Sequence, residues 1–138
     1  CSSDIVGRAS VVDGDTVDIH GQRIRLHGID APESGQRCKK AGQEYRCGKV
    51  AAFALSDKIG ASPIRCKGQN TDRYKRLIAI CYLGRIDLNE WMVSEGHAVA
   101  YRKYAMDYVG AERWARLYRR GIWAGRFVMP WDWRKGAR

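Results

Sequence analysis

The sequence predicts an α+β domain, mainly a β-barrel, with helices interleaved after a strand-rich first third. Two observations predict this class. Short runs of β-branched and alternating residues dominate the first 33 positions, and longer runs with apolar residues three or four apart follow them. The chain has 138 residues, 45% hydrophobic and 29% charged, which excludes general disorder and suits one domain with a buried core. We therefore expect a single domain over residues 1–138.

The first elements are short strands separated by tight turns. An Asp-Gly-Asp turn signal and a His-Gly-Gln turn divide segments rich in β-branched residues. The third segment alternates apolar and polar side chains, as a half-buried strand does, and Pro32 ends it because proline cannot continue a hydrogen-bonded ladder. We expect these strands at residues 4–12, 17–19 and 23–29.

Helical spacing begins in the second third of the chain. Residues 34–46 are polar and predict a loop, and residues 61–67 and 77–83 predict a hairpin joined by a polar connection. Glycines at 96 and 121 end two of the helical segments. The expected helices cover residues 49–59, 88–95 and 108–120. Residues 125–138 form an aromatic, basic tail without clear periodicity.

Charge is unevenly distributed along the chain. It carries 25 Lys and Arg residues against 15 Asp and Glu, a formal net charge of +10. Residues 1–35 hold three basic and six acidic residues, a net of −3, so the remainder carries +13. This pattern suggests a polyanionic partner and a cation site, and the alternative is a basic surface that only maintains solubility. The longest apolar run has seven residues, 77–83, so no transmembrane segment is expected.

Four of the five cysteines fall in two local pairs, Cys38 with Cys47 and Cys66 with Cys81. Neither pair has the short spacing of structural zinc sites, although spacing alone leaves zinc and reduced core cysteines open. Two disulfides would suit an oxidising compartment, so we expect a secreted, periplasmic or cell-envelope protein. Cys1 is left over, either as the acylated first residue of a lipoprotein or merely as the point where the chain begins.

Acidic residues gather around the turn and the end of the expected strands. Asp13 and Asp15 are two residues apart, so both project to the same side of an extended backbone. Asp30 and Glu33 sit at the end of the next strand. Clustered carboxylates repel one another and require a cation or arginines nearby. A hard, oxygen-binding ion such as Ca²⁺ is the expected cation. The alternative is that both segments are only turns.

Two arginines complete this pattern. Arg25 lies on the same expected strand as Asp30, and Arg76 follows the polar connection of the hairpin. Guanidinium groups fork onto phosphate oxygens, so the pair can neutralise a pentacoordinate phosphorane. In a chain this basic, either arginine alone is equally compatible with a solvated surface position.

Several motifs occur in order: VVDGDTV at 11–17, RLHGIDAPE at 25–33, TDRYKR at 71–76, LNE at 88–90 and GIW at 121–123. Together they closely resemble the thermonuclease family, typified by staphylococcal nuclease, over roughly residues 5–124. The resemblance implies a five-stranded OB-fold barrel with three α-helices. It also implies a Ca²⁺-dependent phosphodiesterase that hydrolyses DNA and RNA and leaves 3′-phosphate and 5′-hydroxyl ends.

The resemblance also assigns the metal site. Asp15 and Asp30 look like the two calcium carboxylates, and Asp13 resembles an acid behind them. Ala31 stands where the family often has threonine and supplies a main-chain carbonyl ligand. Since only a side chain is lost, the resemblance implies that calcium binding survives.

The remaining roles follow in the same way. Glu33 looks like the general base that activates or orients water, and Arg25 and Arg76 look like the pair that stabilises the transition state. The nucleotide-contacting candidates, with a preference for single-stranded substrate, are Arg73, Tyr74, Tyr101 and Tyr104.

Some segments fall outside these assignments. Trp91, Trp114 and Trp123 are expected in the core, and Trp131 and Trp133 are expected to pack over the barrel or the third helix. The alternative functions are a non-catalytic nucleic-acid- or protein-binding OB module, or a cell-surface role with another polyanion such as a polysaccharide. A monomer is the default oligomeric state.

Overall fold

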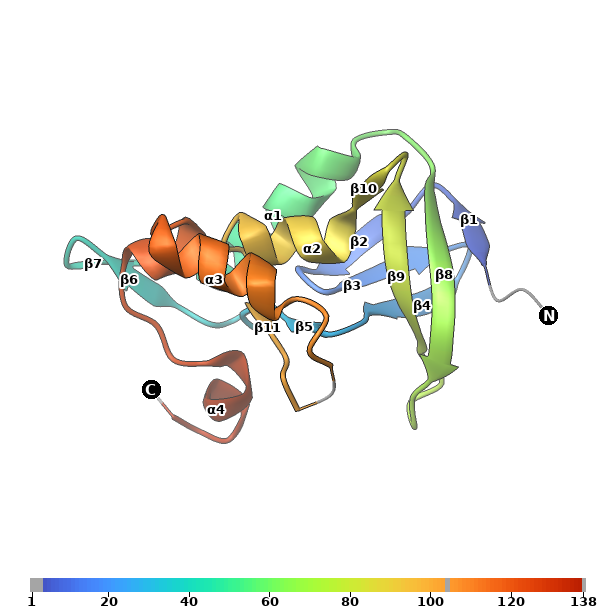
Figure 1. Cartoon of the computed structure of the whole chain (residues 1–138). Coiled ribbons are helices and arrows are strands. Elements are labelled where there is room, and N and C mark those ends of the chain that lie inside the picture. Colours follow the sequence, from blue (N-terminus) through green and yellow to red (C-terminus); the bar gives the residue numbers. More distant parts are fainter. Residues whose placement is uncertain (1–3, 104, 138) are drawn as a thin grey trace.

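The computed structural model describes residues 4–103 and 105–137 (Figure 1). Its main sheet follows the strand order β1-β8-β9-β4-β3-β2. These strands are β1 (Ile5–Gly7), β2 (Ser10–Asp13), β3 (Thr16–Ile19), β4 (Gln22–Leu26), β8 (Ile64–Thr71) and β9 (Leu77–Leu83). The short β10 (Ile86–Asp87) pairs with β9 outside this order.

The N-terminal stretch closes the sheet on itself. β1 and β2 are separated by residues 8–9 only, yet they lie at opposite ends of the strand order. One short stretch of chain can supply both edges only if the sheet curls round. Within the described residues, five stretches therefore form the curled sheet: 5–13, 16–19, 22–26, 64–71 and 77–83. This confirms the α+β class and is consistent with the OB-fold.

The expected strand over residues 23–29 is interrupted. Gly28 adopts φ 74°, a left-handed conformation that interrupts the extended chain between β4 and the following β5 (Ile29–Asp30). β5 leaves the main sheet and pairs with β11 (Val99–Ala100), while the Gly28 carbonyl accepts a hydrogen bond from the Tyr101 N–H at 2.9 Å. The break thus directs Asp30 away from the barrel ladder and toward β11.

Within the described residues, the helices include two short ones that the sequence did not predict. The three expected helices are α1 (Cys47–Ile59), α2 (Leu88–Ser94) and α3 (Val109–Leu117). The two further ones are the 3₁₀ helix η1 (Gly121–Ala124) and, in the tail, α4 (Pro130–Arg134). Helix α4 has five residues, too few to display a helical period. The expected loop over residues 34–46 contains a hairpin of β6 (Cys38–Lys40) and β7 (Gln43–Tyr45).

Two apolar clusters hold these elements together. The larger fills the space between the curled sheet and helices α1 and α2, and includes Ile24, Leu55 and Met92. The smaller lies between the β6–β7 hairpin, β11 and η1, and residues 127, 129 and 131 of the tail pack against it. The tail therefore packs on this second cluster rather than over the barrel. Trp114 lies outside both clusters at 51% exposed, so its predicted core position is wrong.

Both predicted disulfides are confirmed. Cys38–Cys47 joins β6 to the start of α1, and Cys66–Cys81 joins opposite positions of β8 and β9. In the described ranges, no helix is both long and apolar enough to cross a membrane. Cys1 and Tyr104 lie outside the described residues.

Candidate active site

Asp15 stands in the β2–β3 turn and connects three parts of the fold. Its Oδ2 accepts the Ala31 N–H at 2.9 Å, and its Oδ1 accepts the Thr16 hydroxyl at 3.1 Å. Its main-chain carbonyl accepts the Leu26 N–H at 2.8 Å. Asp15 is only 7% exposed, so these bonds fix its carboxylate beside the residue that follows Asp30.

Asp30 lies at the end of β5 and is fully buried. The Arg25 guanidinium lies between the two aspartates, with Nη2 3.6 Å from Asp30 Oδ1 and Nη1 3.5 Å from Asp15 Oδ2. Burial is the main reason that the pKa of Asp30 rises to about 6. The structure therefore brings together Asp15, Asp30 and Arg25.

Asp13 belongs to the same electrostatic group. Partial burial raises the pKa of Asp13 above its ordinary value, and the negative charges of Asp15 and Glu33 raise it further. The positive charge of Arg25 acts in the opposite direction. Asp13 thus lies near the carboxylates of Asp15 and Glu33.

Glu33 is held by a buried residue that sequence reasoning missed. Gln36 is fully buried, its Oε1 accepts the Glu33 N–H at 3.2 Å, and its own N–H donates to the Glu33 carbonyl at 2.8 Å. Gly48, in the first turn of α1, packs so closely that a Cβ there would collide with the Glu33 carbonyl. A lone glutamine in a polar segment carries no sequence signal of burial, so this support was not predictable.

Arg76 immediately precedes β9, and its guanidinium pairs with Asp72. The Arg76 Nε donates a hydrogen bond to Asp72 Oδ2 at 2.7 Å. Burial of Asp72 opposes its ionisation, but hydrogen bonds from Arg76 and Tyr74 outweigh it and lower the pKa of Asp72. Strands β4 and β9 pair in parallel with Arg25 opposite Ile78, so Arg76 lies just before the strand that neighbours Arg25.

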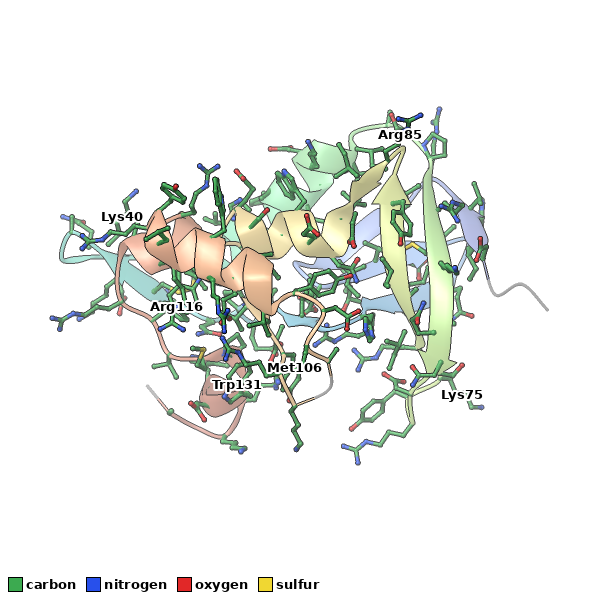
Figure 2. All side chains as sticks on the ribbon, in the orientation of Figure 1. Lys40, Lys75, Arg85, Met106, Arg116 and Trp131 are labelled. Atoms are coloured by element: carbon green, nitrogen blue, oxygen red, sulfur yellow. A yellow bond between two sulfur atoms is a disulfide. The ribbon has the colours of Figure 1, made fainter. Side chains whose placement is uncertain are left out.

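The nucleotide-contacting candidates lie at two separate places. Tyr74 is 66% exposed at the β8–β9 connection, whose far end Lys75 marks in Figure 2, and the Arg73 guanidinium lies 5.0 Å from the centre of its ring. Tyr101 follows β11 and stacks on Trp131, with ring centres 5.2 Å apart and planes 12° apart. Tyr74 is thus exposed to solvent, whereas Tyr101 is covered by Trp131 of the tail.

The second unpredicted residue is Arg134, from the end of α4. Its Nη1 and Nη2 lie 3.0 and 2.8 Å from the two carboxylate oxygens of Asp30, and Nη1 lies 2.5 Å from Glu33 Oε1. The hydrogen bond to Asp30 is the main reason that the pKa of Arg134 rises. Contacts between residues more than 100 positions apart, in a tail outside the recognised motifs, left no signal in the sequence.

The chemistry of these groups fits a hard cation. In residues 4–103 and 105–137, no cluster of three or more His, Cys, Asp or Glu residues is arranged as a metal site. Asp15 and Asp30 nevertheless offer buried, anionic oxygen donors whose charges are offset by Arg25 and Arg134. Two carboxylates suit an oxygen-binding divalent ion that takes its other ligands from carbonyls, water or substrate. Arginines beside these carboxylates can bind phosphate oxygens.

Comparison with known proteins gives consistent matches. The family described as Staphylococcal nuclease homologue matches residues 23–125. Succinoglycan biosynthesis protein ExoI of Rhizobium meliloti (strain 1021) is 41% identical, over 86% of this chain and 64% of that protein. A probable staphylococcal-like nuclease of Oryza sativa subsp. japonica is 33% identical, over 84% of this chain and 30% of that protein. Micrococcal nuclease of Shigella flexneri is 32% identical, over 93% of this chain and 79% of that protein.

These matches differ in how much of each relative they cover. The chain spans less than two thirds of the first two of these proteins but more than three quarters of the Shigella nuclease. The matched family region includes Arg25, Asp30, Glu33 and Arg76. With the curled sheet and the acidic and arginine groups described above, these matches show that the chain belongs to the staphylococcal nuclease family.

Proposed function

We propose that this chain is a Ca²⁺-dependent phosphodiesterase that hydrolyses DNA and RNA, with a preference for single strands. The observation that carries the proposal is the placement of Arg25 between the buried carboxylates of Asp15 and Asp30, with Glu33 next to them. Nucleases of this family generally depend on a metal ion, and hard oxygen donors favour calcium over softer metals.

Each residue has a role in this proposal. Asp15, Asp30 and the Ala31 carbonyl would hold the ion, which when bound polarises the scissile phosphate as a Lewis acid. Glu33 accepts a proton from the attacking water or orients it for in-line attack on phosphorus. Arg25 donates to the phosphate oxygens as their negative charge develops.

The leaving group and the bases complete the reaction. Arg76 stabilises the departing 5′ oxygen, so that cleavage leaves a 3′-phosphate and a 5′-hydroxyl. Arg73 binds the neighbouring phosphate, while Tyr74 and Tyr101 stack on bases. Stacking on exposed base faces favours single-stranded or frayed substrate.

Charge and disulfides support the setting of this activity. A net charge of +10 attracts nucleic acid and makes binding sensitive to salt. The two disulfides favour an environment outside the cytoplasm, and we place the protein in the secreted, periplasmic or cell-envelope fraction, acting as a monomer.

Hydrolysis of single-stranded DNA with Ca²⁺ and with a chelator tests the proposal. Glu33→Gln and Arg76→Ala should each lower kcat/KM by about 100-fold or more, the scale of removing one transition-state contact. The matched controls are Glu44→Gln and Arg85→Ala, which change exposed residues outside the site. Full activity in chelator would reject the metal, and unchanged rates in both site variants would reject the site.

A second candidate function follows from the 41% identity to a succinoglycan biosynthesis protein. In that case the basic surface would bind an acidic polysaccharide. Binding of succinoglycan without any cleavage of DNA or RNA in Ca²⁺ would favour this function over the nuclease. A salt-sensitive DNA complex that is never cleaved would instead favour a non-catalytic binding module.

A further inference from the structure

Helix α4 presents two residues to the candidate site. Trp131 and Arg134 are three positions apart, so a single helical turn places both side chains on one face. Figure 1 shows α4 on the same side of the molecule as β5 and β11, and Figure 2 shows Trp131 on that helix. Trp131 covers the Tyr101 ring, and Arg134 reaches the Asp30 and Glu33 carboxylates.

The part of the tail that precedes α4 is fixed to the fold by hydrogen bonds. The Gln36 Nε2 donates to the Val128 carbonyl at 2.6 Å, and Lys39 and Arg126 exchange two backbone hydrogen bonds of 2.8 Å. Up to residue 128 the tail is therefore part of the fold. Because Gln36 also holds Glu33, the point where the tail is attached lies beside the residue that the tail covers.

The contacts of Arg134 conflict with the proposed metal site. Its two nitrogens bind both oxygens of the Asp30 carboxylate, which are the oxygens that would have to bind a divalent ion. Arg25 already lies 3.6 Å from Asp30 Oδ1, so a divalent ion would be a third cation beside this buried carboxylate, and like charges repel each other. Trp131 likewise occupies one face of the Tyr101 ring, which a base therefore cannot stack on while the contact lasts.

We propose that α4 is an intramolecular strap that closes the site by occupying the place of the cation at Asp30 and of a base at Tyr101. This inference rests on the proposed nuclease function. Binding of Ca²⁺ displaces Arg134, Trp131 leaves Tyr101, and the strap swings outward about the attachment at Val128. The apparent metal affinity is then lowered by the fraction of molecules in which the strap is open.

Calorimetric titration of the full chain with CaCl₂, without substrate, tests the strap. Arg134→Gln should bind Ca²⁺ about tenfold more tightly than the unaltered chain, which corresponds to a strap closed in roughly nine molecules in ten. Lys135→Gln is the matched control, because it removes the same charge from the neighbouring exposed residue and should change the affinity less than twofold.

A second variant covers the case in which Arg134→Gln fails to fold. Trp131→Leu keeps an apolar side chain on the cluster below but removes the stacking on Tyr101, and it should also tighten Ca²⁺ binding. Equal or weaker affinity in the folded variants, with DNA cleavage intact, overturns the strap alone. If no variant binds Ca²⁺ and none cleaves DNA, the proposed function fails and the strap with it.

Discussion

Asn89 offers a sharp test of how the site is supported. It is fully buried on α2 and joins three backbone groups. Its Nδ2 donates to the carbonyls of His27 at 2.9 Å and Ala79 at 3.1 Å, and its Oδ1 accepts the Cys81 N–H at 3.1 Å. His27 lies between Arg25 and the break at residue 28, so Asn89 fixes the chain on which the site is built.

The cost of Asn89→Ala can be worked out from these bonds. The Ala79 carbonyl also accepts the His27 N–H at 2.8 Å, so it keeps one partner after the change. The Cys81 N–H and the His27 carbonyl each lose the bond to Asn89, and each such buried loss costs about 1–2 kcal/mol. We therefore expect a loss of about 2–4 kcal/mol, or roughly 10 °C in the melting temperature for a domain of this size.

Urea unfolding followed by circular dichroism measures this loss. Asn70→Ala is the matched control, because that residue is exposed on β8 and should change the free energy of unfolding by less than about 0.5 kcal/mol. A loss below about 1 kcal/mol for Asn89→Ala would mean that water or a rearrangement replaces these bonds, and the reasoning would be refuted.

Three further predictions concern local packing, pH and the disulfides. Gly48→Ala should lower the nuclease rate at least about tenfold by displacing the Glu33 loop, while Gly110→Ala, which meets open space on α3, should leave the rate unchanged. Burial lowers the pKa of His97, so the unfolded chain binds its proton more readily. Stability should therefore rise with pH up to about 6.5 and fall on acidification, and urea unfolding of His97→Gln at several pH values should show a flatter profile; parallel profiles would contradict this. Replacing both Cys66 and Cys81 by alanine opens a loop of about 15 residues and should cost about 3 kcal/mol, and a cost within 1 kcal/mol of zero would count against it.

Features that depend on residues close together in the chain could be predicted from the sequence. Asp15, Asp30 and Arg25 belong to turns and strands whose order alone brings them together, and both cysteine pairs are near neighbours in the chain. The unbroken strand over 23–29 was wrong because alternation does not reveal the backbone dihedral of Gly28.

Long-range contacts account for what the sequence did not reveal. Gln36 and Arg134 act through partners up to 104 positions away, in segments without period or motif. Trp114 shows the opposite error, because its helical context predicts a buried aromatic residue although α3 turns it to solvent. The metal, the substrate and the catalytic roles remain predictions that the experiments above address.

The double use of the N-terminal stretch has a consequence for folding kinetics. Ile5 pairs with Cys66, about 60 positions along the chain, so β1 cannot dock until β8 is available. Pairing across such a distance raises the contact order and slows folding, because the entropy of closing the loop is lost before the contacts form. The β8–β9 hairpin, pinned by its own disulfide, is a local structure that can form first and serve as the template. Oxidation of Cys66 and Cys81 should therefore speed the closure of the barrel as well as stabilise it.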